Sequence, residues 1–150
     1  MYLKHLYRTG FLDFYRVATD ATPLERPYYE GGVRAGFPSP ADDFSEAAID
    51  LNRELVKNPA STFFCRVSGD SMRDVGIGDG DLLVVDKSLQ PRDGSIAVCF
   101  IDGAFTLKRI KVERDCCWLI PAHPDYEPIR VTPDNEFVVW GIVTYSIKAF

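Results

Sequence analysis

The sequence predicts a mostly β domain: a folded-over or closed sheet with one short helix beside it, preceded by an extended N-terminal arm. The second half of the chain consists of short apolar or alternating runs between turn-forming residues, which is typical of strands. One earlier segment carries helix start and stop signals. The stretch "GGVRAGFPSP", dense in glycine and proline, divides the chain into an arm, residues 1–40, and a domain, residues 41–150.

The arm begins with apolar residues spaced by three and four positions, from Leu3 to Ala18. This spacing predicts an amphipathic helix, although Gly10 lies within it and weakens the pattern. A segment of about 35 residues cannot bury a core of its own. The arm therefore packs either on its own domain or on a partner, and the pattern leaves both open.

The domain begins with a predicted helix over residues 42–59, "DDFSEAAIDLNRELVKNP". Two aspartates suit its first turn and Pro59 ends it. Its apolar stripe consists of Phe44, Ala48, Leu51 and Leu55.

Strands are predicted for the rest of the domain. Two of them flank Asp102-Gly103, a pair typical of a two-residue hairpin turn. Together they predict a sheet closed or folded over on itself. The predicted strands are "STFFCRV", "DLLVVD", the two halves of "SIAVCFIDGAFTLKRIKV", "CWLIPA" and "EFVVWGIVTYSI".

Composition narrows the function classes. The chain has 150 residues and a formal net charge of -5, which argues against direct DNA binding through a basic face. It has no run of about 18 apolar residues and no signal-peptide pattern at its start, so we expect a cytoplasmic protein. Cys65 and Cys99 fall in apolar runs, and Cys116 and Cys117 are adjacent. This arrangement predicts buried thiols rather than a metal or cofactor site.

Ser71, in "SGDSM", is the first candidate for chemistry, although serine, glycine and aspartate together often form only a turn. A nucleophilic serine needs a base to take its proton. His123, with Asp125 close by, is one choice, but it lies in a proline-rich loop that is typical of a surface histidine.

Lys108 is the other choice for the base. A lysine acts as a base only as the neutral amine, so it must be desolvated. Strand alternation in "AFTLKRI" places Lys108 with small or apolar neighbours and points Arg109 the opposite way. An edge-strand lysine that prevents aggregation shows the same pattern.

A possible substrate lies within the chain itself. Ala35-Gly36, in "VRAGFPSP", joins two small residues just before the domain. Small residues let an extended backbone enter a narrow cleft, and glycine adds freedom for a bent geometry. A plain linker has the same composition.

These features occur in the same order in the LexA/UmuD family of self-cleaving proteins, which the chain resembles most in its UmuD branch. The resemblance runs from about residue 35 to the end, and the arm before it is much less similar. It is carried by "AGFPSPADDF", "AIDLNREL", "SGDSMRDVGIGDGDLLVVD", "GAFTLKRI" and "VVWGIV".

The resemblance implies a LexA-like catalytic domain and roles for particular residues. Ser71 matches the nucleophile, Lys108 the general base, and Ala35-Gly36 the bond that is cut. The backbone amides of Ser71 and Met72 match the oxyanion-binding donors. UmuD proteins have a cysteine before the glycine, whereas alanine at this position is LexA-like.

The resemblance also implies partners. Family members form homodimers and cleave themselves when stimulated by the RecA filament on single-stranded DNA. The trimmed UmuD form joins a Y-family, UmuC-like polymerase subunit in error-prone synthesis past lesions during the SOS response.

Three other functions fit parts of the sequence. A LexA-type cleavable repressor needs a helix-turn-helix domain, for which the arm is too short and proline-interrupted. A signal peptidase uses a related Ser-Lys pair but needs a membrane anchor. A structural dimer with a silent dyad would differ only in failing to cleave itself.

Overall fold

The computed structural model describes residues 3–9, 12–17, 20, 23, 25–29 and 46–150. The predicted bond Ala35-Gly36 and the predicted boundary at residue 40 both lie outside the described residues. The described strands are β1 (Leu3–Thr9), β2 (Leu12–Val17), β3 (Glu25–Tyr29), β4 (Glu46–Asp50), β5 (Thr62–Val67), β6 (Leu82–Asp86), β7 (Ile96–Ile101), β8 (Ala104–Val112), β9 (Cys117–Ile120), β10 (Ile129–Val131) and β11 (Phe137–Ile147). The helices of the described part are α1 (Leu51–Leu55) and the 3₁₀ turn η1 (Arg73–Val75).

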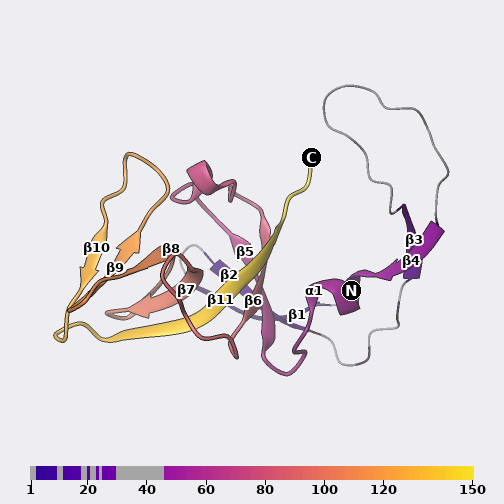
Figure 1. Ribbon diagram of the computed structural model, residues 1–150, viewed down its shortest axis with the longest axis horizontal. Helices are drawn as coiled ribbons and strands as arrows, with labels where there is room; N and C mark the ends of the chain where they lie inside the picture. The colour runs from indigo at the N-terminus through magenta and orange to yellow at the C-terminus, as the bar shows by residue number, and fades with distance from the viewer. Residues whose placement is uncertain (1–2, 10–11, 18–19, 21–22, 24, 30–45) are drawn as a thin grey trace.

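Nine strands form one antiparallel sheet in the order β1-β2-β5-β6-β11-β7-β8-β9-β10. The strands β3 and β4 form a separate two-stranded sheet, which stands apart from the main sheet in Figure 1. The predicted mostly β fold is confirmed. No helix in the described part of the chain is long and apolar enough to cross a membrane.

The main sheet buries side chains on both faces. Cys65 of β5 and Leu83 of β6 face the largest core cluster, whereas Phe64 and Val84 face a smaller one on the opposite side. This alternation is the period of two expected for a strand with both faces covered. The largest cluster contains Leu12, Phe14, Cys65, Val67, Met72, Ile77, Leu83, Val85, Val98 and Leu107.

The long strand β11 joins the two halves of the sheet. Its first part pairs with β7 and its second part with β6, and the register shifts between Val139 and Gly141 and again between Val143 and Tyr145. A Cβ atom at position 141 would lie 2.5 Å from Val85 Cγ1, so only glycine fits there. Bulges of this kind bend a strand and let one long element serve both halves of a folded-over sheet.

The hairpin predicted around Asp102-Gly103 is confirmed. The strands β7 and β8 pair from Ile101 and Ala104 outward, and both turn residues have positive φ, 47° and 86°. Two positive φ angles are what a two-residue turn that matches the strand twist requires.

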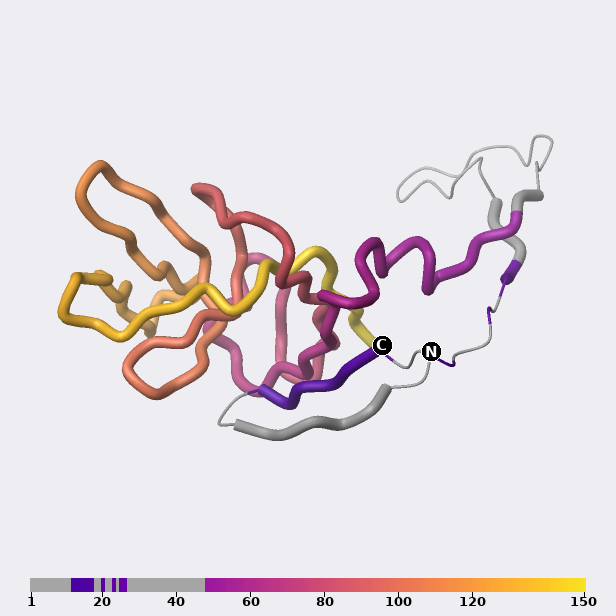
Figure 2. Tube along the Cα trace, turned by 90° about the horizontal axis from the view of Figure 1, so that it is seen from below, coloured from indigo at the N-terminus to yellow at the C-terminus, as the bar shows by residue number. Residues whose placement is uncertain are grey.

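The helix predicted from Leu3 to Ala18 is wrong. Residues 3–9 and 12–17 form the antiparallel strands β1 and β2, and β2 pairs with β5. Leu12 and Phe14 are buried whereas Asp13 and Tyr15 are only partly buried, so burial alternates with the period of two of a strand. The tertiary ladder with β5 overrides a weak helical spacing. The sequence left open whether the arm packs on its own domain or on a partner. Residues 12–17 pack on their own domain, as the indigo segment in Figure 2 shows.

The predicted helix over 42–59 is also largely wrong, since residues 46–50 form β4 and the helix spans only Leu51–Leu55. The Asp50 side chain accepts a hydrogen bond of 3.0 Å from the Asn52 amide, so the helix is capped eight residues later than expected. Leu51, assigned to the buried stripe, is 56% exposed. Pairing of β3 with β4 holds the preceding residues extended.

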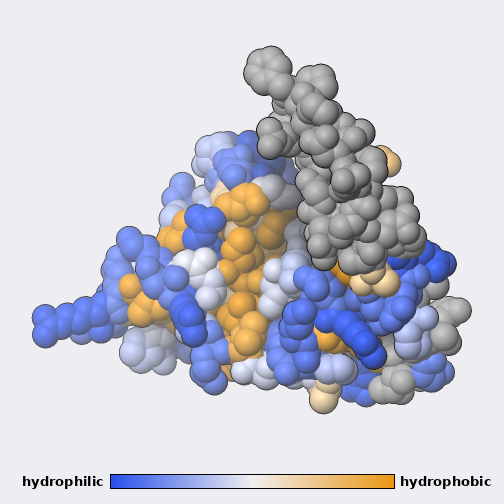
Figure 3. All heavy atoms as spheres, turned by 45° about the vertical axis from the view of Figure 1, so that its right-hand side comes forward, coloured by the Kyte–Doolittle hydropathy of each residue, from blue (hydrophilic) through white to orange (hydrophobic). Residues whose placement is uncertain are grey.

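Apolar side chains also reach the surface. The face in Figure 3 carries a band of apolar side chains bordered by polar ones. Val112, Val138 and Phe150 are among the large apolar residues that are exposed. Exposed apolar surface of this kind is typical of contacts between proteins.

Candidate active site

Ser71 lies in the loop between β5 and β6, and the loop is firmly held. The neighbouring Met72 side chain is 1% exposed and belongs to the main core. The Gly69 amide donates to Asp79 Oδ1 at 2.8 Å, and Gly69 itself has a φ of 98°, a conformation that favours glycine. A buried anchor on one side and a fixed turn on the other therefore set the position of Ser71.

Two backbone hydrogen bonds tie this loop to the segment after β9. The Ala122 amide donates to the Ser71 carbonyl, and the Asp74 amide donates to the Ala122 carbonyl, each at 2.8 Å. Neither the Ser71 nor the Met72 amide donates to another residue within the described ranges. These two N–H groups therefore remain available to a ligand oxygen.

Lys108 of β8 meets Ser71 across the sheet. Lys108 Nζ lies 3.3 Å from Ser71 Oγ, and it donates to Thr106 Oγ1 at 2.9 Å and to the Leu107 carbonyl at 3.0 Å. The Lys108 residue is 7% exposed, whereas Arg109 is exposed. The strand alternation read from the sequence placed these two basic residues on the correct faces.

The surroundings of Lys108 favour its neutral form. Burial lowers the pKa of its ammonium group below the ordinary value, with the Cys99 thiol acting weakly in the opposite direction. Within the described ranges, no carboxylate contributes to its electrostatic environment. A neutral amine has two N–H donors and one lone pair. Thr106 and Leu107 match the two donors, which leaves the lone pair for the Ser71 hydroxyl proton.

A groove of about 240 Å³ opens onto this pair. It is lined by residues 67–72 and 106–108, together with Leu12, Tyr126, Glu127 and Ile129. An apolar groove with a few convergent polar groups is the usual form of a binding site.

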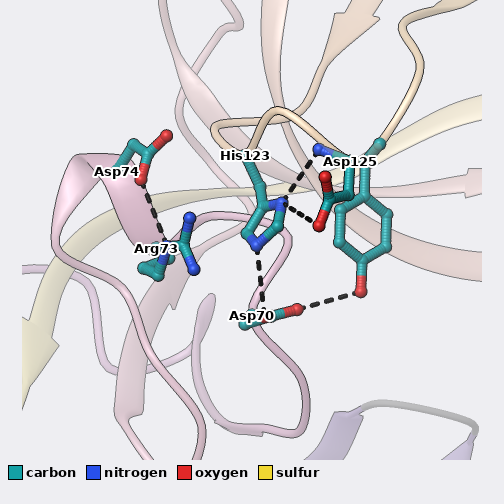
Figure 4. A network of polar contacts seen from close by, with 6 residues as sticks. Asp70, Arg73, Asp74, His123 and Asp125 are labelled. Atoms are coloured by element: carbon teal, nitrogen blue, oxygen red, sulfur yellow. Dashed lines mark hydrogen bonds and ion pairs between the residues drawn. The ribbon is translucent and has the colours of Figure 1, made fainter.

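His123 is buried at 9% exposure, contrary to the surface position predicted for it. Figure 4 shows its ring between Asp70 and Asp125: Nε2 lies 3.3 Å from Asp70 Oδ2, and Nδ1 accepts from the Asp125 amide at 3.1 Å. Asp70 also accepts a hydrogen bond of 2.9 Å from the Tyr126 hydroxyl, which lowers the pKa of the Asp70 carboxyl. Among the described side chains, no hydrogen bond or ion pair joins His123 to Ser71, so the triad Ser71, His123 and Asp125 is not assembled.

The sequence did not predict this polar network. Asp70 and His123 are 53 positions apart and carry no local pattern that links them. The only signal was that Asp70 adjoins Ser71 and that Tyr126 follows His123 by three residues. The polar network of Asp70, His123 and Tyr126 fastens the Ser71 loop to the segment 121–126.

The burial predicted for Cys65 and Cys99 from their apolar sequence context is confirmed. Cys65 and Cys99 are buried, and burial raises the pKa of each thiol to about 12. Cys116 and Cys117 are partly exposed. Across the described ranges, no group of three or more histidine, cysteine, aspartate or glutamate side chains could hold a metal ion.

Residues 27–144 match the family model described as Peptidase S24-like. The chain belongs to this family. The match covers most of the chain and includes both Ser71 and Lys108. It confirms the resemblance to the LexA/UmuD proteins on a basis independent of the geometry.

Similar known proteins support the same family assignment. Protein MucA of Salmonella typhimurium is 44% identical over 122 residues, which are 81% of this chain and 83% of MucA. Protein SamA of Salmonella typhimurium strain LT2 is 39% identical over 133 residues, 87% of this chain and 92% of SamA. LexA repressor 2 of Xanthomonas campestris pv. campestris is 38% identical over 130 residues, 81% of this chain but 61% of the repressor. The chain is a UmuD-like SOS mutagenesis protein in a family of serine peptidases.

Proposed function

We propose that the chain cleaves its own Ala35-Gly36 bond, with Ser71 as nucleophile and Lys108 as general base. The observation that carries this proposal is the 3.3 Å separation of Lys108 Nζ and Ser71 Oγ, with the amine buried. A nucleophile and base within hydrogen-bond reach, with the base oriented by further groups, is the expected arrangement for covalent catalysis.

The reaction follows from the positions of these groups. Neutral Lys108 takes the Ser71 hydroxyl proton as Oγ attacks the Ala35 carbonyl carbon. The Ser71 and Met72 amides stabilise the oxyanion that forms. Protonated Lys108 then gives its proton to the departing Gly36 nitrogen, which leaves Ala35 joined to Ser71 as an ester. A water molecule, deprotonated by Lys108, hydrolyses this ester and restores Ser71.

The Ser71 loop contributes to catalysis by being held still. The two backbone hydrogen bonds to Ala122 and the buried Met72 side chain fix the oxyanion donors before the substrate arrives. Donors that are already in place cost no reorganisation when charge develops.

The cellular role follows from the family. Cleavage is stimulated by the RecA filament on single-stranded DNA, and the trimmed chain forms a homodimer that joins a Y-family, UmuC-like polymerase subunit in the cytoplasm. Exposed apolar residues such as Val112 and Val138 support protein partners. The net charge of -5 supports access to DNA through those partners rather than directly.

Incubation with RecA, ATP and single-stranded DNA tests the proposal. We expect two fragments, one ending at Ala35 and one beginning at Gly36, identified by their masses. A cut at another bond, or no cut under conditions that cleave a LexA control, contradicts the assignment.

A further inference from the structure

In sequence, the strand β2 precedes the proposed cut, but it packs against a part of the chain that follows the cut. It spans residues 12–17, which precede Ala35-Gly36, but its neighbour in the sheet is β5, residues 62–67. Cutting the chain at residue 35 breaks no contact between these two strands. Whether the N-terminal fragment then leaves depends on how strongly the strands hold each other.

The side chains of β2 are deeply buried in the domain. Phe14 has no exposed surface, and its ring centroid lies 4.9 Å from that of Trp140 and 5.1 Å from that of Phe105. Leu12 is 2% exposed and belongs to the same core cluster. Removing a fully buried aromatic side chain leaves a cavity that the surroundings fill only in part.

The backbone contact is equally extensive. Five residues of β2 pair with five of β5, from Leu12 opposite Val67 to Arg16 opposite Phe63. The other side of β5 is occupied by β6. Loss of β2 would leave β5 as an edge strand with a row of unpaired backbone groups. A strand added to a sheet edge, with alternate side chains in pockets, is also a common way for proteins to bind peptides.

Leu12 also connects the antiparallel pair β1 and β2, hereafter the N-terminal hairpin, to the candidate active site. It lines the groove onto which Ser71 and Lys108 open. The N-terminal segment therefore forms part of the site wall as well as part of the core.

We propose that residues 1–35 stay bound to the domain after cleavage, as a non-covalent strand pair held by Leu12 and Phe14. This inference rests on the proposed function for the position of the cut. The first product is then a two-chain protein that keeps the nine-stranded sheet. A partner that binds the edge of β5 must first displace the N-terminal hairpin. Cleavage makes this displacement possible, but it does not by itself remove the hairpin.

The test uses a full-length chain that cannot cut itself. Ser71→Ala removes the nucleophile, and the recognition sequence of an unrelated site-specific protease replaces residues 30–36. After cutting by that protease, native mass spectrometry is expected to give a complex that contains both fragments, at their summed mass or, for the homodimer, at twice that mass. Separate fragments from this chain overturn the proposal. Because the cut does not depend on Ser71, failure of self-cleavage leaves this result unaffected.

Variants in β2 identify the contact. On dilution after cutting, the Phe14→Ala fragments are expected to separate at a protein concentration at least about 10-fold higher than the parent fragments do. Asp20→Ala, which changes an exposed residue outside the strand, is the matched control and is expected to behave as the parent. Equal retention by Phe14→Ala and the parent contradicts the proposed contact. If Phe14→Ala does not fold before cutting, Phe14→Leu takes its place, with a smaller release expected.

Fluorescence of Trp140 gives a second readout. The only other tryptophan is Trp118, so a Trp118→Phe background isolates the Trp140 signal. Retention predicts an unchanged emission maximum after cutting, because Phe14 still covers the indole. A shift to longer wavelength on cutting the parent chain means that the hairpin has left, which overturns the proposal.

Discussion

Two buried basic residues approach the Ser71 loop, Lys108 from strand β8 and His123 from the segment between β9 and β10, and their surroundings differ. Lys108 contacts a hydroxyl and a carbonyl besides Ser71, with no carboxylate among its described neighbours. His123 lies between the carboxylates of Asp70 and Asp125.

This difference assigns the two residues different tasks. A general base must be unprotonated and must point at the proton that it takes. Burial favours the neutral form of Lys108, and its amine lies next to Ser71 Oγ. The His123 ring is directed at Asp70 instead, so it positions the loop. The geometry and the neighbouring charges therefore support the proposal that Lys108 is the base, although histidine is the commoner base.

The largest effect expected from this contrast is on cleavage. Ser71→Ala and Lys108→Ala each remove a group that is proposed to act directly on the reacting atoms, so each is expected to lower the rate by at least about 1,000-fold. His123→Gln keeps a polar side chain near Asp70 and is expected to cost less than about 10-fold. Fragment yield over time, with RecA filament present, measures all three.

Arg109→Ala is the matched control for Lys108→Ala. It removes the neighbouring basic residue, which is exposed on the opposite face of β8, and is expected to cleave nearly as the parent does. An inactive Arg109→Ala together with an active Lys108→Ala would invert the assignment of faces.

A smaller effect is expected on stability. Because burial lowers the pKa of folded Lys108, the unfolded chain binds an extra proton between the folded value and the unfolded value of about 10.4. The free energy of unfolding of the parent therefore rises with pH through that window, whereas Lys108→Met lacks this contribution. Urea unfolding at several pH values is expected to show the parent gaining stability relative to Lys108→Met as pH approaches about 10.4. A constant difference between the two chains contradicts a neutral Lys108 in the fold.

Much of the site was predictable because its signals are local. Alternation along a strand places Lys108 inward and Arg109 outward, and Asp102-Gly103 predicts the turn that precedes them. The family resemblance supplied the pairing of Ser71 with Lys108, which are 37 positions apart. Side-chain periodicity alone gives no distance across a sheet.

The rest could not be predicted because its causes are not local. The spacing from Leu3 to Ala18 suits a helix about as well as two strands, and only the ladder with β5 decides between them. Asp50 caps a helix whose predicted range began eight residues earlier, at Asp42. His123 is in a proline-rich loop, and its contact with Asp70, which is distant in sequence, has no local signal.

The pH dependence of cleavage without RecA tests most directly whether Lys108 is the base. Burial lowers the pKa of Lys108 from its ordinary alkaline value, so with Lys108 as the base the rate is expected to keep rising from pH about 7.5 into the alkaline range as the neutral fraction grows. The His123→Gln chain is expected to show the same profile, since His123 takes no proton from Ser71. A rate that rises near pH about 6.5 and is flat above about 7.5 contradicts the account and returns His123 as the base.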